Sequence, residues 1–256
     1  MSSPVSAIIV PTLGLRNEFL VQCLRSIRKS GKAHICIVSP DLHQVEHFRE
    51  EGLMDQHVRD TSEGLPAAIN RGINRLPDQI KFVNWLGDDD LLKEGSLNSM
   101  QTFLEKNPRA GMVFGKCSYI DEKGNQIWIN KSGQWACSIL SFGPCLVPQP
   151  GALFRRSVFD SVGGLSENLR WAFDLDLFIR FKKISEVVYL PIDAASFRWH
   201  PDSLSVGLRK GSVNEASRVR QANLSRVLRK LSFIWELPIK RATYVSGIKL
   251  SSRKGV

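Results

Sequence analysis

The stretch that decides the fold is IKFVNWLGDDDLL, residues 80–92. Its first half is apolar, aromatic and β-branched, which is the composition of a buried strand. The apolar run stops at Gly87, and three carboxylates follow directly: Asp88, Asp89 and Asp90. Three adjacent negative charges at the end of a hydrophobic strand repel one another and lose hydration unless a positive group lies beside them. The stretch therefore predicts a central strand that ends in an acidic turn.

A divalent cation that carries a polyphosphate is one positive partner for this turn. Carboxylate oxygens are hard ligands that suit Mg²⁺ or Mn²⁺, and such a metal bridges to the phosphates of a substrate. In open α/β sheets, ligands bind at the carboxyl ends of the strands, where these aspartates are expected. The spacing alone is equally consistent with a solvated acidic turn that caps a helix near Gly95.

Strands and helices alternate on both sides of this stretch. Before it, apolar runs predict strands at 5–12, 34–38 and near Val58, and helical spacing predicts helices at 17–29 and 64–76. This alternation predicts an α/β fold with a mostly parallel, doubly wound sheet.

The second half of the chain continues the pattern less regularly. Helices are expected at 96–107 and 171–183, strands at 112–120, 127–129 and 187–191, and a strand followed by a short helix at 151–164. Residues 131–149 read as an irregular loop of the kind that often forms a wall beside an active site, with Trp135 either in that wall or as a buried anchor of the loop. Residues 197–207 read as a polar loop.

Composition indicates a globular protein. The 256 residues are 43% hydrophobic and 23% charged, and no apolar run reaches the ~18–20 residues of a membrane-spanning helix. The start, MSSPVSAIIVPT, lacks a basic region before its apolar run and reads as a first strand rather than a signal peptide. Five scattered cysteines without a CxxC pair favour a reducing, cytoplasmic location.

The net charge of +10 is concentrated at the C-terminal end. From Lys210 onward there are eleven Lys or Arg against two Glu. Residues 211–232 read as one surface helix, with an apolar stripe at Leu224, Val227, Leu228 and Leu231. We expect a basic helical tail at 210–256 that lies on an anionic membrane surface at the inner face of the membrane or packs on a domain formed by residues 1–209.

Six motifs carry a resemblance to a known family. They are IIVPT (8–12), GLPAAINRGI (64–73), WLGDDDLL (85–92), PGALFRRSVFDSVGG (150–164), WAFDLDLFIRF (171–181) and FRWHPDSLS (197–205). In this order and at these intervals they resemble family 2 glycosyltransferases with the GT-A fold, over residues 5–207.

The resemblance implies that the acidic turn holds a divalent metal, Mn²⁺ or Mg²⁺, and the diphosphate of a nucleotide sugar. The first aspartate of the family's D-x-D-D pattern falls on Gly87, so the metal is assigned to Asp90, and contacts to the sugar or ribose to Asp88 and Asp89. His200 is implied as a metal or diphosphate contact, or is merely structural. Arg198, expected in the same loop, is implied to neutralise the leaving nucleotide.

The nucleotide pocket is implied at the ends of the first two strands. Pro11 and Thr12 match positions that line it. Relatives often carry two aspartates after the second strand, but Ser39 and Pro40 stand there and Asp41 is displaced by one residue. Asp41 therefore either contacts the base or caps its own loop.

Asp174 matches the position of the catalytic base in inverting relatives, although Phe173 replaces the glutamate that often precedes it. Asp174 and Asp176 lie two residues apart, so on a helix they point to different sides. One of them is expected to face a cleft while the other caps the helix or pairs with Arg180, four residues on. Two acids on a charged helix surface are the alternative.

The implied activity is an inverting, metal-dependent transfer of a sugar from a nucleotide-sugar donor to a hydroxyl of a glycan or lipid-linked acceptor, as in polysaccharide biosynthesis. A nucleotidyltransferase also uses strand-end aspartates and Mg²⁺, but VPTLGLRNEF supplies only Gly14 and Arg16 of its usual loop. A nucleic-acid-binding protein is the third reading. We expect no nucleic-acid partner, because the positive charge is confined to the tail.

Overall fold

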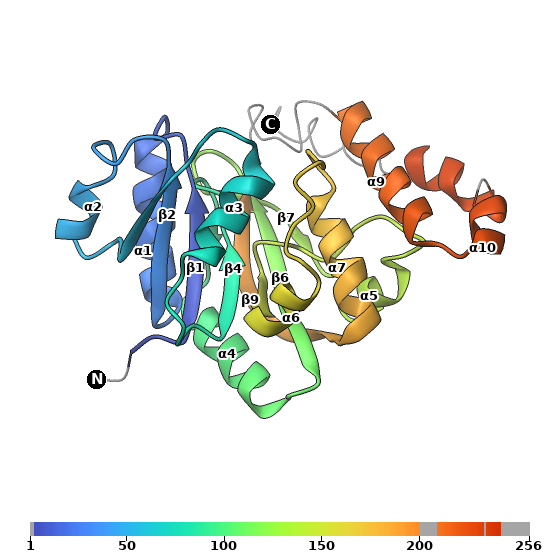
Figure 1. Ribbon diagram of the computed structural model, residues 1–256, viewed down its shortest axis with the longest axis horizontal. Helices are drawn as coiled ribbons and strands as arrows, with labels where there is room; N and C mark the ends of the chain where they lie inside the picture. Colours follow the sequence, from blue (N-terminus) through green and yellow to red (C-terminus); the bar gives the residue numbers. More distant parts are fainter. Residues whose placement is uncertain (1–2, 200–208, 233, 242–256) are drawn as a thin grey trace.

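The computed structural model describes residues 3–199, 209–232 and 234–241, which form one curled sheet with helices on both faces (Figure 1). The strands are β1 (Ser6–Pro11), β2 (Ala33–Ser39), β3 (Gln56–Arg59), β4 (Phe82–Trp85), β5 (Leu91–Leu92), β6 (Ala110–Ile120), β7 (Gln126–Asn130), β8 (Ala152–Arg155) and β9 (Glu186–Arg198). The helices are α1 (Asn17–Ser30), α2 (His47–Glu50), α3 (Leu65–Asn74), α4 (Ser96–Lys106), α5 (Trp135–Ile139), α6 (Arg156–Ser161), α7 (Phe173–Ile184), α9 (Arg209–Asn223) and α10 (Arg226–Leu231). The predicted α/β class is confirmed.

The strand order is β3-β2-β1-β4-β8-β6-β9-β5, and β7 pairs with β6. The first four of these strands run parallel to one another, whereas β8 runs antiparallel to both β4 and β6. Parallel strands end at the same edge of a sheet. The carboxyl ends of β1, β2, β3 and β4 therefore lie together, and the acidic turn follows β4 there.

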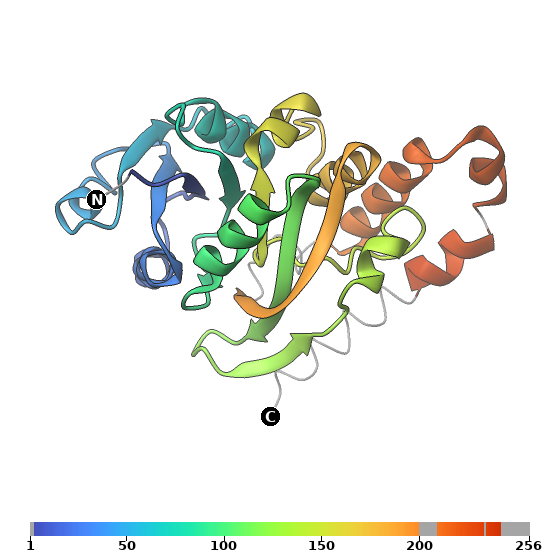
Figure 2. The same ribbon diagram turned by 90° about the horizontal axis from the view of Figure 1, so that it is seen from below.

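Two apolar cores cover the two faces of the sheet. Successive side chains of β1 point to opposite faces of the sheet. Ala7 and Ile9 pack in the core with α3, α6 and α7, whereas Ile8 and Val10 pack in the core with α1 and α4. The view from below shows α1 and α4 on one side of the sheet and α3, α6 and α7 on the other (Figure 2). This is the doubly wound arrangement that the alternating pattern predicted.

Strand β9 is longer than predicted. It extends past residue 191 to Arg198, so Arg198 lies in a strand and not in the expected loop. The ladder to β6 skips from the Phe114–Tyr189 pair to the Lys116–Asp193 pair, and Pro191 lies within this irregularity. A proline has no N–H to donate and is tolerated at such a bulge, which is why it does not end the strand.

The segment 131–149, predicted as irregular, contains the short helix α5. Five residues are too few for a periodic pattern to reveal a helix. Tertiary contacts hold it: Lys182 Nζ donates to the carbonyls of Cys137 (2.6 Å) and Ser138 (3.3 Å), near the C-terminal end of the helix.

The C-terminal part forms two helices in place of the single one expected at 211–232. The break follows Leu224, where Ser225 caps the new helix α10. Val219 and Leu224 are buried, whereas Val227, Leu228 and Leu231 are exposed, so the predicted apolar stripe divides into an inward and an outward part. The division of the chain at residue 209 stays a prediction. In the described residues no helix is both long enough and apolar enough to span a membrane.

Candidate active site

A cavity of about 790 Å³ opens at the carboxyl ends of the parallel strands. Residues from widely separated parts of the chain line it. The predicted site residues among them are Pro11, Thr12, Asp88, Asp89, Asp90 and Asp174. The structure thus brings the acidic turn, the end of β1 and the start of α7 to one cavity.

The acidic turn is compact because Gly87 has no side chain. A Cβ atom at this position would lie 2.9 Å from Asp89 Oδ1 and 3.1 Å from Asp90 Oδ2. All three aspartates of the turn are buried. The glycine that departs from the family pattern therefore allows two carboxylates to fold back over the backbone.

Arg16 is a partner of the acidic turn that the sequence did not reveal. Its guanidinium contacts Asp88 Oδ1 at 2.9 Å and Asp89 Oδ2 at 2.7 Å. Thr12 Oγ1 donates to the second oxygen of Asp88 at 2.6 Å. The loop after β1 thus provides a positive charge and a hydroxyl for the turn after β4, a pairing that parallel neighbouring strands make possible.

Arg198 does not line the cavity. It is 1% exposed, and its guanidinium donates to the carbonyls of Asp89, Asp121 and Glu122. Its backbone N–H donates to Asp90 Oδ1 at 2.9 Å. Arg198 therefore lies behind the acidic turn and holds Asp90 in place. Burial, together with the charge of Asp89, raises the pKa of Asp90.

Asp41 is exposed and does not line the cavity. Its Oδ1 accepts the N–H of His43 at 2.9 Å, which is the loop-capping geometry that the sequence left open. Asp60, directly after β3, lines the cavity instead. Nothing in the sequence motifs singled out Asp60. His200 lies outside the described residues.

Asp174 and Asp176 point to different surroundings, as their spacing predicts. Asp176 accepts from Arg180 Nε at 2.9 Å and from the Ser166 hydroxyl at 2.7 Å. Asp174 lines the cavity, and burial raises the pKa of its carboxyl from 3.8 to about 6. A carboxylate with this pKa is ionised at neutral pH and is a better proton acceptor than an ordinary aspartate.

The wall beside Asp174 is largely aromatic. Arg170, Trp171 and Phe173 line the cavity directly before Asp174, and the Arg170 guanidinium lies 5.1 Å from the Trp171 ring. Other aromatic residues of the lining are Trp85, Tyr119, Phe197 and Trp199. Flat apolar rings suit the apolar faces of sugars. Trp135 is 53% exposed and is neither part of this wall nor a buried anchor.

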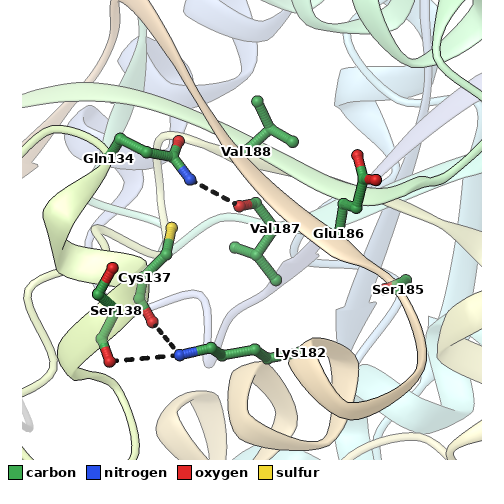
Figure 3. Close-up of a pocket in the computed structure, with 8 residues that line it drawn as sticks. All are labelled: Gln134, Cys137, Ser138, Lys182, Ser185, Glu186, Val187 and Val188. Atoms are coloured by element: carbon green, nitrogen blue, oxygen red, sulfur yellow. Dashed lines mark hydrogen bonds between the residues drawn. The ribbon is translucent and has the colours of Figure 1, made fainter.

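A second hollow, of about 360 Å³, lies where α5 meets α7 and the start of β9 (Figure 3). Lys182 is bound to the end of α5, and the amide of Gln134 bonds Val187 O at 3.2 Å and Tyr189 N at 2.6 Å. These polar side chains are already hydrogen-bonded to backbone groups. The hollow therefore lies at a packing contact between α5, α7 and β9, and its lining includes none of the predicted site residues.

The acidic turn offers few metal ligands. Within the residues described, no group of three or more His, Cys, Asp or Glu side chains is arranged to hold a metal ion. Magnesium usually takes only one or two protein carboxylates and binds substrate phosphates and water with its remaining positions. The ion pairs of the turn found among these residues involve Asp88 and Asp89. Asp90, which borders the cavity, fits such a partial site.

The sequence of this chain is only distantly similar to known sequences. No family model matches the chain. An uncharacterized glycosyltransferase of Rickettsia typhi is 24% identical over 134 residues, which are 49% of this chain and 41% of the relative. The chain thus matches about two fifths of the length of this curated relative.

Comparison with solved structures is more informative. TarS of S. aureus, residues 1–349 in complex with UDP-GlcNAc, superposes with a TM-score of 0.66 at 13% identity, over 90% of this chain and 70% of the other. The mannosyltransferase PcManGT from Pyrobaculum calidifontis, in complex with GDP-Man and Mn²⁺, gives 0.64 at 15% identity, over 97% and 76%. At these identities the likeness establishes the fold. The fold expected from the six motifs is confirmed: this chain has the GT-A fold of these glycosyltransferases.

Proposed function

We propose that this chain is an inverting glycosyltransferase that moves a sugar from a nucleotide-sugar donor to a hydroxyl of a glycan or lipid-linked acceptor. One observation carries the proposal. A single cavity holds an acidic turn at the carboxyl ends of parallel strands and, on another wall, an aspartate whose pKa is about 6. The first suits a nucleoside diphosphate with its metal, and the second suits an attacking hydroxyl.

The donor is proposed to lie along the ends of β1, β3 and β4. Pro11 and Thr12 border the nucleotide, and Asp88 and Asp89 accept hydrogen bonds from hydroxyls of the ribose or the sugar. We assign the carboxylate nearest the base to Asp60, since it lines the cavity while Asp41 caps its own loop. Fold neighbours solved with UDP-GlcNAc and with GDP-Man support a donor of this class without deciding between the bases.

The proposed chemistry is a single displacement. A carboxylate oxygen of Asp174 accepts the proton of the acceptor hydroxyl as its oxygen bonds to the anomeric carbon. The bond from that carbon to the diphosphate oxygen breaks, and its electron pair leaves with the nucleoside diphosphate. Attack from the side opposite the leaving group inverts the anomeric carbon.

Mn²⁺ or Mg²⁺ is proposed as the cofactor, with Asp90 as its protein ligand and His200 as a second one. The neighbour that contains Mn²⁺ supports this assignment. A divalent ion at this place supplies positive charge that stabilises the departing diphosphate. Arg198 contributes indirectly, because it fixes the backbone and the carboxylate of the acidic turn.

The direct test is release of nucleoside diphosphate from UDP-GlcNAc and from GDP-mannose in Mn²⁺, with water and simple glycosides as acceptors. Asp174→Asn should lower kcat about 10²–10⁴-fold, the usual weight of general-base catalysis, with donor affinity little changed. Asp176→Asn is the matched control and should retain kcat. A large loss of kcat in Asp176→Asn with only a small loss in Asp174→Asn would contradict the assignment of the base. Wild-type protein that releases nucleoside diphosphate from neither donor would contradict the proposed function.

We further infer that the protein acts at an anionic membrane surface on the cytoplasmic side, from a cluster called here the apolar face. It consists of exposed apolar side chains of α10 and of the helical residues that follow: Val227, Leu228, Leu231, Ile234 and Leu237. Arg226 and Lys230 are exposed beside it. Glu236 is buried against Arg220 and Glu215 is buried too, so the exposed charges of the described C-terminal residues, 211–232 and 234–241, are positive.

Co-sedimentation with vesicles tests this location. Wild-type chain should bind vesicles containing anionic phosphatidylserine more strongly than neutral ones, and salt should release it, since each basic residue near the surface contributes about 1 kcal/mol. The double variant Val227→Ser/Ile234→Ser should lose binding. Ile184→Ser, which changes an exposed isoleucine outside the face, should retain it. Equal binding to both kinds of vesicle, or equal binding by all variants, would refute the inference.

A further inference from the structure

Helix α9 belongs to the basic C-terminal part of the chain, yet one acidic residue in it points inward. Glu215 is 4% exposed. Its Oε2 accepts the backbone N–H of Trp171 at 2.6 Å and of Ala172 at 2.8 Å, and the N–H of Arg170 lies 3.1 Å from Oε1 and 3.2 Å from Oε2. One carboxylate therefore holds three consecutive N–H groups.

These three residues form the turn that starts α7. The first N–H groups of a helix and of the turn before it have no partner within the helix, and a carboxylate placed there is favoured by hydrogen bonding and by the helix dipole. Asp174 follows Ala172 by two residues and is in the first turn of α7. The orientation of Asp174 thus depends on a turn that another element holds.

A second contact joins α9 to the same turn. The Trp171 ring packs against Gly211, where an added Cβ would lie 2.7 Å from a ring carbon. At the other end of the pair, Lys183 Nζ donates to Asn223 Oδ1 at 2.6 Å. Helix α9 therefore contacts α7 or its preceding turn near both ends, and it lies beside α7 in the ribbon view (Figure 1).

We propose that Glu215 is a positioning residue for the active site. Through the N–H groups of residues 170–172 it fixes Trp171, which belongs to the cavity wall, and the carboxylate of Asp174. This rests on the proposed role of Asp174. Loss of the carboxylate leaves three N–H groups without their acceptor, and a buried donor that is left unpaired destabilises the turn. The turn then moves to find other partners, and Asp174 moves with it.

The test compares Glu215→Ala and Glu215→Gln with Glu236→Ala in the full chain. Glu236 is the matched control, because it is an equally buried glutamate of the C-terminal part whose partner is Arg220. For the nucleotide sugar that wild-type protein hydrolyses best, Glu215→Ala should lower kcat 10–100-fold while the Kd of the nucleoside diphosphate stays within threefold. Glu215→Gln, which keeps one acceptor oxygen, should lose less. Glu236→Ala should lower Tm at least as much as Glu215→Ala does, while its kcat stays within twofold of the wild-type value.

A second measurement does not depend on activity. Hydrogen exchange should become faster at the amides of residues 170–172 in both Glu215 variants, and not in Glu236→Ala. If exchange there is unchanged, or if kcat stays within twofold of wild type while Tm falls, Glu215 is only structural and the proposal is wrong. Failure of the proposed function is a different result: wild-type protein then processes no nucleotide sugar, while the exchange measurement still decides whether Glu215 holds the turn.

Discussion

At the scale of single residues, the environment of each aspartate decides its chemistry. Asp174 and Asp176 are separated by one leucine in the sequence FDLDLF. Asp176 is neutralised by Arg180, whereas Asp174 faces the cavity and its pKa is raised to about 6 by burial. Packing alone therefore places the two carboxylates in different electrostatic environments.

The raised pKa of Asp174 has consequences for both activity and stability. The rate should fall about tenfold per pH unit below pH ~6, because the base is then protonated. Between pH ~4 and ~6 the folded protein keeps a proton that the unfolded chain has lost, so stability should decrease as pH rises through this window. Asp174→Asn should therefore remove the acidic limb of the rate profile and raise Tm at pH 7.5. A lower Tm, measured by calorimetry, would contradict a raised pKa.

Arg198 gives a residue-scale prediction about stability. Arg198→Ala should lower the free energy of unfolding by about 3–5 kcal/mol, because it leaves three carbonyls behind the acidic turn without their donor and removes the positive charge near the buried Asp90 carboxylate. Urea denaturation measures this. Arg109→Ala is the matched control: Arg109 forms an exposed ion pair with Glu186 and should change stability by less than about 1 kcal/mol. Similar values for the two variants would show that Arg198 does not hold the acidic turn.

The sequence predicted the acidic turn from the apolar run that precedes it, and it singled out Asp174 through a motif that resembles the glycosyltransferase family. It did not predict the partners that place them. Arg198 and Asp90 are separated by 108 residues, Arg16 and Asp89 by 73, and Glu215 and Ala172 by 43. Contacts over such separations depend on the strand order, which no local pattern contains.

At the scale of elements, α9 and the residues after α10 are joined by a buried ion pair. Arg220 Nε lies 2.7 Å from Glu236 Oε1, and both side chains are at most 4% exposed. Breaking such a pair costs about 3–5 kcal/mol, whereas replacing both partners by apolar groups is often neutral. Arg220→Leu and Glu236→Leu should each destabilise the protein, and the double variant should recover most of the loss. Additive losses in a double-mutant cycle would argue against a coupled pair.

The differences between predicted and observed elements have the same origin. Helix α5 and the second half of β9 are held by contacts with distant parts of the chain. The helix predicted at 211–232 breaks at Leu224, which turns inward to be buried. In each case packing overrides the local pattern.

At the scale of the whole molecule, proteins with very different sequences share this fold. The solved glycosyltransferases share only 13–15% identity with this chain yet superpose with TM-scores of 0.61–0.66. The order of strands and helices along the chain is what builds this sheet. That is why the order of six short motifs was enough to predict the fold, while the donor and acceptor stay open.

The proposed function requires that the cavity at the acidic turn binds a nucleoside diphosphate with a divalent metal. Titration calorimetry with UDP and GDP in Mn²⁺ tests it most directly, since binding requires no acceptor. We expect one site for at least one nucleotide, lost in excess chelator and weakened at least tenfold in Asp90→Ala, with binding retained in Asp176→Asn. Binding that is unchanged in Asp90→Ala and in chelator, or no binding of either nucleotide by the wild-type chain, would contradict the account.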